Sequence, residues 1–181
     1  MKIPENAKRV FKGEVFEIYQ WDQKMFDGST KTFEMAKRPD TVLVILTANG
    51  KILVAKEEQP NFKRDFGFAG GKVDDGEEPL IAAKRELMEE AGMQSDDWEL
   101  LKTYEPFNRV DWNIHVFVAR NAVKVREHSQ ESGEKIEFYE MDFDEFADKV
   151  SLQEWGEFAN EILRMKLDGR LEEFKLRLFP Q

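Results

Sequence analysis

One continuous stretch of the sequence decides the fold: Gly71-Lys-Val-Asp-Asp-Gly-Glu77, then Glu78-Pro-Leu-Ile-Ala-Ala-Lys84, then Arg85-Glu-Leu-Met-Glu-Glu-Ala-Gly-Met93. Its middle part has helical periodicity. Pro79 suits a first helical turn, and Gly92 suits the left-handed residue that ends a helix. The residues before it, 61–76, show no periodicity. The sequence therefore predicts a loop over 61–76 that leads into a helix over about 79–91.

Three carboxylates share one face of this predicted helix. Glu86, Glu89 and Glu90 stand at positions i, i+3 and i+4, so they project within a single turn. Like charges this close destabilise a helix by about 0.2–0.5 kcal/mol per pair, so the cluster makes physical sense if divalent cations bind among them. The opposite face carries apolar residues at spacings of three and four that predict packing against a sheet: Leu80, Ala83, Leu87 and Ala91.

The available side chains restrict which metal could bind. The chain has no cysteine and two histidines, His115 and His128, so a metal must be held mainly by oxygen. Carboxylate oxygens favour Mg²⁺ or Mn²⁺ over zinc. Arg85 lies eight residues after Glu77 and four before Glu89, and we expect it to pair with a loop carboxylate and fix the approach of the loop to the helix.

The rest of the chain predicts strands interrupted by single helices. We expect a hairpin over 14–36 with its turn at Asp27-Gly28, and a second hairpin around Asn49-Gly50. A Ser151-Leu-Gln-Glu154 capping box predicts the start of a helix that ends at Gly169. The expected strands are 41–46, 52–55, 98–104, 113–119 and 135–141, and the expected later helices are 143–150 and 152–168. This order predicts an α/β sandwich with a mixed sheet.

Composition limits the classes of partner and location. The 181 residues fit one domain with a small extension, and the net charge of −10 opposes binding to nucleic acid or an anionic membrane. The N-terminal residues lack the apolar run of a signal peptide, and no stretch approaches the ~18 apolar residues of a membrane helix. We expect a cytoplasmic protein that binds neither nucleic acid nor membrane.

Residues Gly71 to Met93 match the full Nudix box, Gly-x₅-Glu-x₇-Arg-Glu-hydrophobic-x-Glu-Glu-x-Gly-hydrophobic, without a departure. The alternative, an ordinary solvated acidic helix, would produce the constrained positions on the order of once in a million such chains. The chain thus resembles the Nudix hydrolases. The resemblance implies an α/β/α sandwich over 41–181 and an N-terminal hairpin extension over 1–40.

The resemblance also implies the chemistry and the roles of the box residues. It implies Mg²⁺-dependent hydrolysis of a nucleoside diphosphate linked to another group, by in-line attack of water on one phosphorus. Glu86 and Glu90 would be the core metal ligands, and Glu89 a ligand or a base that orients the water. The carbonyl oxygen of Gly70 would be a further ligand. Arg85 would hold these groups in place.

A general base outside the box is expected in the acidic segment 129–137. This segment is similar to the loop that supplies a late catalytic glutamate in ADP-ribose pyrophosphatases. Glu134 is the first choice and Glu131 the second. An ordinary solvated charged loop is the alternative.

Substrate contacts are expected from arginines and aromatic residues. Arg38, Arg64 and Arg109 are candidate phosphate contacts because a guanidinium matches phosphate oxygens bidentately. Trp112, with Phe107 in the same predicted loop, could stack on a base. The alternatives are ordinary surface charges for the arginines and core or interface packing for the aromatic residues. His115 alternates with apolar residues and is expected to be a packed or surface side chain.

Features outside the box indicate the substrate class, which we expect to be ADP-ribose or a nucleotide sugar. The N-terminal hairpin with Arg38-Pro39-Asp40 is similar to the extension of ADP-ribose and nucleotide-sugar pyrophosphatases, where it helps to build a homodimer and the nucleotide site. Residues 66–71, Phe-Gly-Phe-Ala-Gly-Gly, depart from the Leu-Pro-Ala-Gly approach of that branch. A (deoxy)nucleoside triphosphate or oxidised-nucleotide pyrophosphohydrolase is therefore a second reading, and a non-catalytic nucleotide sensor a third.

Overall fold

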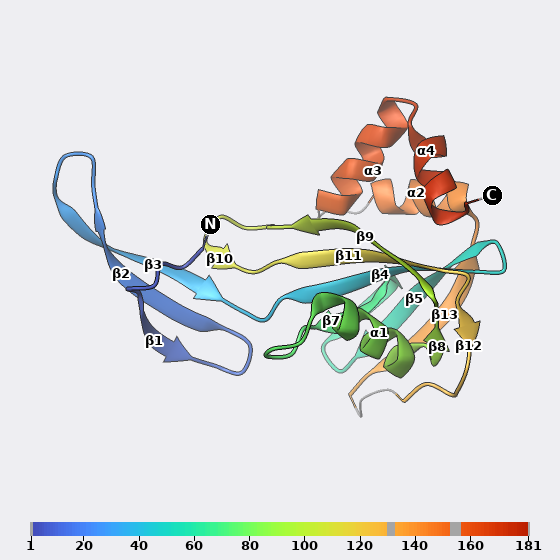
Figure 1. Ribbon diagram of the computed structural model, residues 1–181, viewed down its shortest axis with the longest axis horizontal. Coiled ribbons are helices and arrows are strands. Elements are labelled where there is room, and N and C mark those ends of the chain that lie inside the picture. Colours follow the sequence, from blue (N-terminus) through green and yellow to red (C-terminus); the bar gives the residue numbers. More distant parts are fainter. Residues whose placement is uncertain (1, 130–132, 153–156, 181) are drawn as a thin grey trace.

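A seven-stranded mixed sheet forms the centre of the computed structural model, which describes residues 2–129, 133–152 and 157–180. Five of its strands run in the order β13-β5-β4-β11-β9, while β6 pairs with β5 and β7 with β4 (Figure 1). The strands are β4 (Thr41–Ala48), β5 (Lys51–Gln59), β6 (Phe62–Gly67), β7 (Ala69–Lys72), β9 (Asp97–Tyr104), β11 (Ile114–Arg120) and β13 (Lys135–Met141).

The central strands are apolar because both faces of the sheet are covered. Most of β4 and β11 is buried, and the two strands are parallel, whereas the remaining pairs in this sheet are antiparallel. The predicted mixed sheet is confirmed. The tight turn at Asn49-Gly50 joins β4 to β5 as predicted, with both residues at positive φ.

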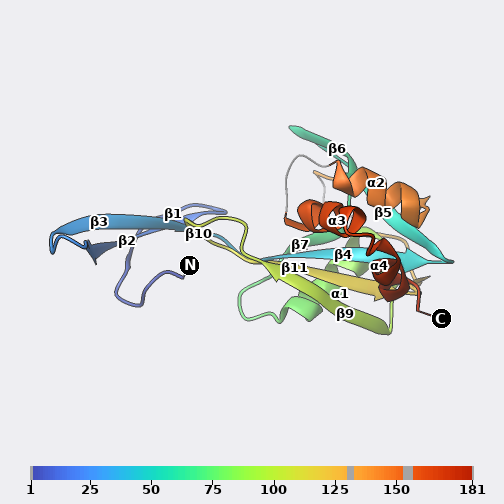
Figure 2. The same cartoon turned by 90° about the horizontal axis from the view of Figure 1, so that it is seen from above.

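Helices cover the two faces, which gives the predicted α/β/α sandwich (Figure 2). Helix α1 (Pro79–Glu90) packs on one face through Ala82, Ala83 and Leu87. The opposite face is covered by α2 (Phe143–Ser151), α3 (Glu157–Leu167) and α4 (Leu171–Leu178). None of the described helices is long and apolar enough to cross a membrane.

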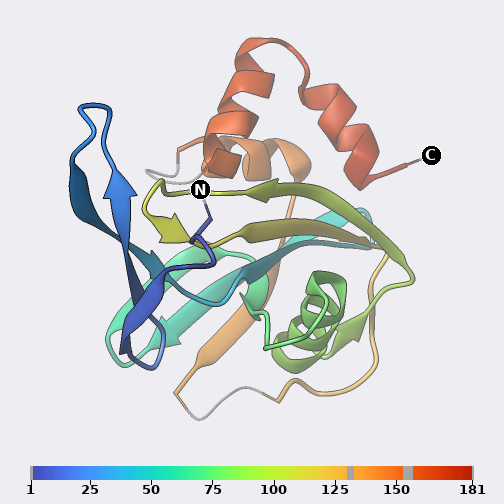
Figure 3. The same cartoon turned by 60° about the vertical axis from the view of Figure 1, so that its left-hand side comes forward.

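A second, smaller sheet projects from the body as an arm (Figure 3). The predicted hairpin over 14–36 is confirmed in β2 (Glu17–Lys24) and β3 (Thr30–Lys37). The sequence reasoning missed β1 (Lys8–Lys12), which pairs with β2. Strand β10 (Val110–Asp111), from the loop between β9 and β11, pairs in parallel with β3 and joins the arm to the body. The division into 1–40 and 41–181 stays a prediction.

The predicted loop over 61–76 is wrong in its first part, where β6 and β7 form. Strand β5 continues to Gln59, beyond the predicted end at residue 55, and turns into β6. The glycine-rich β7 pairs with β4, from Ala69 opposite Val44 to Lys72 opposite Thr41. Glycine has no side chain, so the alternation of apolar and polar residues could not reveal strand β7. The structure of this segment depends instead on backbone pairing with the buried strand β4.

The C-terminal helices also differ from the prediction. Residue 152, where α3 was predicted to begin, lies in a turn, and the described part of α3 starts at Glu157. Helix α2 ends at Ser151, whose hydroxyl donates a hydrogen bond to the Asp148 carbonyl oxygen. Gln153 and Glu154 of the predicted capping box lie outside the described residues. Gly169 follows the end of α3 at positive φ as expected. Helix α4 was not predicted. A two-stranded sheet of β8 (Met93–Gln94) and β12 (Val123–Lys124) lies beside the end of α1.

Candidate active site

Helix α1 and strand β7 lie side by side and together build the candidate site. The helix begins with Pro79 in its first turn and is followed by Ala91 as C-cap and Gly92 at a φ of 62°. Both ends agree with the prediction. Leu80 packs at the edge of the core while Ala83, Leu87 and Ala91 are buried in it, so the predicted apolar stripe is confirmed. Glu86 and Glu90 project from the helix toward β7, where they approach Gly71 and Gly70.

Glu90 is held against the backbone of β7. Its Oε2 atom accepts a hydrogen bond from the Gly70 N–H at 3.0 Å. Burial raises the pKa of Glu90 to about 8, opposed by this hydrogen bond, while the charges of Glu86, Glu134 and Glu57 raise it further. Gly70 has a φ of 152°, and a Cβ there would overlap the Val42 carbonyl oxygen, so this close approach requires glycine.

Glu86 is the second buried carboxylate of the site, with a side chain 13% exposed. Burial raises its pKa, and the Arg85 guanidinium, whose Nη1 lies 2.7 Å from Glu86 Oε1, opposes that rise. The charges of Glu89 and Glu134 add to the rise. A side chain at Gly71 would overlap the Glu86 carboxylate. Gly71, the first residue of the box, therefore leaves room for the Glu86 carboxylate.

Arg85 joins the loop of the box to the helix. It donates through Nε and Nη2 to the two oxygens of Glu77, at 3.1 Å and 3.0 Å, and through Nη2 to the Lys72 carbonyl oxygen at 3.0 Å. The expected pairing with a loop carboxylate is thus present. Arg85 also lies 3.3 Å from Glu89, the most exposed of the three helix glutamates at 44%. The hydrogen bond from Arg85 lowers the pKa of Glu77.

Glu134 lies immediately before β13 and interacts electrostatically with the same carboxylates. Its charge raises the pKa of both Glu86 and Glu90, which places it near them. Its Oε1 atom accepts a hydrogen bond from the side-chain amide of Gln59 at 2.9 Å. Glu131, the second candidate base, lies outside the described residues.

Sequence reasoning missed two residues of β5 that border the site, Glu57 and Gln59. Glu57 is only 9% exposed, although both of its neighbours, Lys56 and Glu58, are exposed. It pairs with Arg64 of β6, whose Nη2 lies 2.5 Å from Glu57 Oε2. The sequence does contain a signal that Glu57 is buried. Alternate residues of a strand point to the same face, and Glu57 follows Leu53 and residue 55 on one face of β5.

The donor set fits a hard divalent cation. The carboxylates of Glu86, Glu89 and Glu90 all offer oxygen ligands, and burial disfavours ionisation of Glu86 and Glu90 unless a positive charge is added. Glu86 is at present engaged by Arg85 and Glu90 by the Gly70 N–H. Within the described part of the chain, no three acidic or histidine side chains converge into a complete metal site as placed. The residues therefore fit Mg²⁺ by chemistry, with side-chain rearrangement on binding.

The four predicted substrate contacts separate into two places. Arg64 lies beside the carboxylates through its pair with Glu57. Arg38, Arg109 and Trp112 lie instead where the arm meets the body. The Arg38 guanidinium stands 4.3 Å from the Trp112 ring centroid, and its buried Nε atom has no hydrogen-bond partner. Burial lowers the pKa of Arg38.

Aromatic residues surround this junction. Trp112 stacks on Phe107 with ring centroids 6.0 Å apart and donates through Nε1 to Thr41 Oγ1 at 3.0 Å. Phe107 is 57% exposed. Arg109 stands 4.3 Å from the Phe33 ring centroid of the arm. The junction is connected to the box, because the Val73 N–H donates to the Asp40 carbonyl oxygen at 2.8 Å.

His115 is a packed side chain, as predicted. Its Nδ1 lies 2.9 Å from Thr103 Oγ1, and its Nε2 lies 3.4 Å from Asp40 Oδ2. Asp40 also accepts hydrogen bonds from the backbone and side chain of Asn113, at 2.8 Å and 3.0 Å. His115 therefore helps to hold β11 and β9 to the residue that precedes β4.

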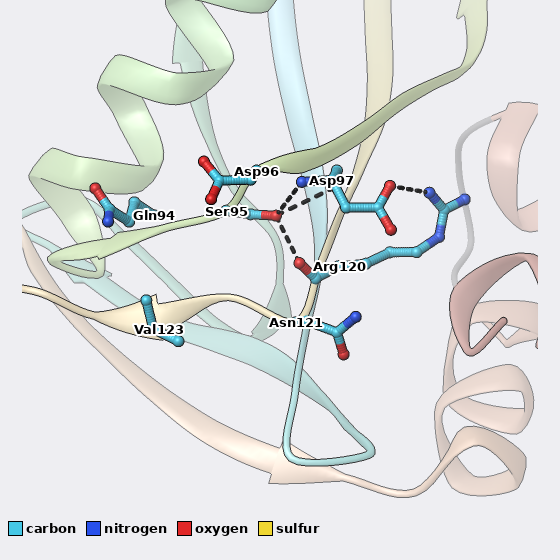
Figure 4. Close-up of a pocket in the computed structure, with 7 residues that line it drawn as sticks. All are labelled: Gln94, Ser95, Asp96, Asp97, Arg120, Asn121 and Val123. Atoms are coloured by element: carbon cyan, nitrogen blue, oxygen red, sulfur yellow. Dashed lines mark hydrogen bonds and ion pairs between the residues drawn. The ribbon is translucent and has the colours of Figure 1, made fainter. Parts of the chain in front are cut away.

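A pocket of about 240 Å³ lies elsewhere, between the ends of β9 and β11 (Figure 4). Arg120 is its buried charged residue and pairs with Asp97 at 2.9 Å, with Glu99, and with the Arg177 carbonyl oxygen. Its hydrogen-bonding groups are thus engaged within the fold. None of the α1 carboxylates lines this pocket, so it is separate from the candidate active site.

Comparison with known proteins agrees with this geometry. A family model described as the NUDIX domain matches residues 37–164. An ADP-ribose pyrophosphatase of Bacillus subtilis (strain 168) is 31% identical over 74% of this chain and 73% of its own length. A methanol dehydrogenase activator of Bacillus methanolicus is 29% identical over 81% of this chain and 75% of its own. A crystal structure of an ADP compounds hydrolase has the same fold, with a TM-score of 0.70 and 21% identity over 92% of this chain and 95% of that one.

Proposed function

Because the chain belongs to the NUDIX family and is a Nudix hydrolase, we propose that it hydrolyses the diphosphate linkage of ADP-ribose or a related nucleotide sugar in a reaction that depends on Mg²⁺. Mn²⁺ is expected to substitute. The names of two relatives, an ADP-ribose pyrophosphatase and an ADP compounds hydrolase from Escherichia coli (strain K12), support this substrate class.

The observation that carries the proposal is the pair of buried carboxylates on α1. Glu86 and Glu90 both have raised pKa values because they are removed from water, with Glu134 and Glu57 close by. Such a cluster opposes folding unless a cation or a proton enters it. The carboxylates of Glu86, Glu89 and Glu90 with the Gly70 carbonyl oxygen would hold Mg²⁺, which supplies charge neutralisation of the diphosphate and a lowered pKa for the attacking water.

Each residue of the site then has a defined task. Arg85 fixes Glu86 and Glu89 relative to the Glu77 loop, so the ligands remain oriented. Glu134 would take the proton of the attacking water on a carboxylate oxygen, and Glu89 would be a metal ligand or a base that orients this water. Arg64, beside Glu57, would contact a phosphate oxygen bidentately.

The junction of arm and body is proposed to bind the nucleoside end. The exposed ring of Phe107 beside Trp112, with Arg38 and Arg109 near it, provides aromatic surface and positive charge together. The Asp40–Val73 hydrogen bond connects this junction to the residues that start the box. A nucleoside diphosphate sugar would span both places, with its base at the junction and the diphosphate in its middle at the α1 carboxylates.

Product analysis tests the proposal. Purified protein with Mg²⁺ is incubated with ADP-ribose, a nucleotide sugar and a set of (deoxy)nucleoside triphosphates including an oxidised one. AMP plus ribose 5-phosphate from ADP-ribose supports the proposal. Nucleoside monophosphate plus pyrophosphate, from triphosphates only, would instead establish the second reading. Binding without any turnover would establish the nucleotide sensor.

We also propose that the arm forms a homodimer contact. It exposes an unusual number of large apolar side chains, among them Phe26, which is fully exposed at its tip, and Val10, Phe11, Val15 and Phe16. Light scattering after size exclusion is expected to give twice the mass of 21.3 kDa. A monomer at all concentrations would contradict the proposal. The cytoplasmic location and the absence of nucleic-acid partners stay predictions.

A further inference from the structure

One side-chain amide beside the active site joins the carboxylate of Glu57 on β5 to that of Glu134, immediately before β13. Gln59 of β5 donates through Nε2 to Glu57 Oε1 at 2.7 Å and to Glu134 Oε1 at 2.9 Å. A primary amide carries two N–H groups on this nitrogen, so one can serve each carboxylate. If this amide were absent, the Glu57 and Glu134 carboxylates, when both are ionised, would repel each other.

Glu57 forms a fixed support for this amide. It is buried, and its other oxygen, Oε2, accepts a hydrogen bond from Arg64 Nη2 at 2.5 Å. The Arg64 guanidinium lies directly over Gly67, where any side chain would overlap it. A hydrogen bond between charged partners that is largely removed from water is strong and geometrically defined. Arg64 therefore fixes Glu57, and Glu57 fixes one N–H group of Gln59.

Strand pairing places Gln59 next to Glu134. Glu58 of β5 is the register partner of Lys135 of β13, and the two strands are antiparallel. The next two residues at this end of the ladder are therefore Gln59 and Glu134, which lie side by side. Glu134 is thus the first residue beyond the regular strand. Backbone pairing alone no longer determines its side-chain direction there, and the hydrogen bond from Gln59 is an interaction that can help to set it.

We propose that Gln59 is a positioning residue that holds the Glu134 carboxylate toward the α1 glutamates in the orientation needed for proton transfer. This inference rests on the proposed function of Glu134 as general base. Gln59 would then be a part of the active site that lies outside the Nudix box, on strand β5. Gln59 itself acts through Glu134 and contacts no reacting atom.

Gln59→Met tests the proposal because methionine has a similar length and volume but no N–H donor. We expect kcat to fall about 10-fold to 100-fold with KM changed less than about 3-fold, since a misplaced catalytic group lowers the rate of the chemical step. Gln59→Glu, which adds a third carboxylate, is expected to be at least as slow. Gln94→Met is the matched control, because Gln94 is an exposed glutamine of β8, and it should keep wild-type kcat.

A double-mutant cycle separates positioning from packing. If Gln59 acts through Glu134, adding Gln59→Met to Glu134→Gln should lower kcat less than about 2-fold further. A crystal structure of Gln59→Met should show the Glu134 carboxylate turned away from residue 59 and from α1. Wild-type kcat in Gln59→Met, or full additivity in the double variant, would overturn the inference while leaving the base role of Glu134 intact. Wild-type kcat in Glu134→Gln would instead refute the base role and the inference with it.

Discussion

The Glu90 carboxylate accepts a hydrogen bond from the backbone N–H of Gly70, 3.0 Å away, and so connects helix α1 to strand β7. This contact brings an ionisable carboxyl group against the sheet, where burial raises its pKa to about 8. The same glycine has a positive φ and no space for a side chain. Local backbone geometry and the electrostatics of the site therefore depend on each other.

Glu90→Gln is expected to stabilise the metal-free protein at pH 8. The folded pKa of Glu90, about 8, lies above the ordinary value of 4.5, so between these pH values the folded chain keeps a proton that the unfolded chain has released. Stability is therefore lost as the pH rises through this window. Glutamine cannot ionise, and its side-chain oxygen can still accept from Gly70. We expect a gain of about 2 kcal/mol, or about 4–8 °C in Tm, in EDTA at pH 8.

The gain should shrink toward pH 5, where wild-type Glu90 is protonated in the fold. Thermal unfolding followed by circular dichroism at both pH values checks this. A variant less stable than the wild type at pH 8 would show that the Glu90 charge is well solvated or compensated within the metal-free fold.

Mg²⁺ is expected to raise the Tm of the wild type and to raise that of Glu86→Gln much less. A ligand at 100 times its Kd adds about 2.7 kcal/mol to the stability of the state that binds it. Glu86 is one of the two buried carboxylates that a cation would neutralise. Hydrolysis by Glu86→Gln should be at least about 100-fold slower at saturating Mg²⁺. Equal Mg²⁺ shifts in both proteins, or near wild-type turnover by the variant, would refute the role of this residue as a metal ligand.

Arg85→Lys is expected to weaken Mg²⁺ binding even though the charge is kept. The guanidinium makes two hydrogen bonds to Glu77 and one each to Glu86 and the Lys72 carbonyl oxygen, which a single ammonium cannot reproduce. We expect a loss of about 1–3 kcal/mol in unfolding free energy and a Mg²⁺ requirement raised about 10-fold.

Lys84→Ala is the control for this prediction, because Lys84 is the preceding residue on the exposed surface of the helix. It should change stability by less than about 0.5 kcal/mol. Denaturant unfolding and Mg²⁺ titration of activity measure both variants. If Arg85→Lys and Lys84→Ala behave alike, Arg85 does not organise the ligands.

The sequence predicted the helix of the site well because its signals are local. Proline and glycine mark its two ends, and residue spacing alone places the three glutamates on one face. The pairing of Arg85 with a loop carboxylate also followed from spacing, and the structure contains it. The central apolar strands were likewise predicted, because burial of both faces leaves a continuous apolar run in the sequence.

The parts that the sequence could not predict depend on contacts between distant residues. Strand β7 consists of glycines, alanine and lysine, and it is a strand only because β4 lies beside it. Glu57 and Gln59 belong to the site because β5 extends past residue 55 and meets β13 there. Arg38, Arg109 and Trp112, three of the four predicted substrate contacts, lie together at the junction of arm and body because β10 pairs with β3. These two strands are more than 70 positions apart in the sequence.

Gly92→Ala is expected to displace the segment that leads to Glu134. The Gly92 carbonyl oxygen accepts hydrogen bonds from the Val125 and Arg126 N–H groups, and the Glu89 carbonyl oxygen accepts one from the Ser129 N–H at 2.8 Å. A Cβ at Gly92 would overlap the Arg126 carbonyl oxygen, and the φ of 62° adds backbone strain. We expect a loss of about 3 kcal/mol in unfolding free energy and a lowered kcat.

Gly169→Ala separates the two causes of this effect. Gly169 has a similar φ of 71° after α3, but a Cβ there would meet no atom within 4 Å. Only backbone strain should act at this site, at about 1 kcal/mol, with no change in kcat. Urea unfolding and steady-state kinetics of both variants measure the difference. Similar losses of stability with unchanged kcat in both would mean that the contact between Gly92 and Arg126 does not influence the position of Glu134, because strain alone would then account for the effect.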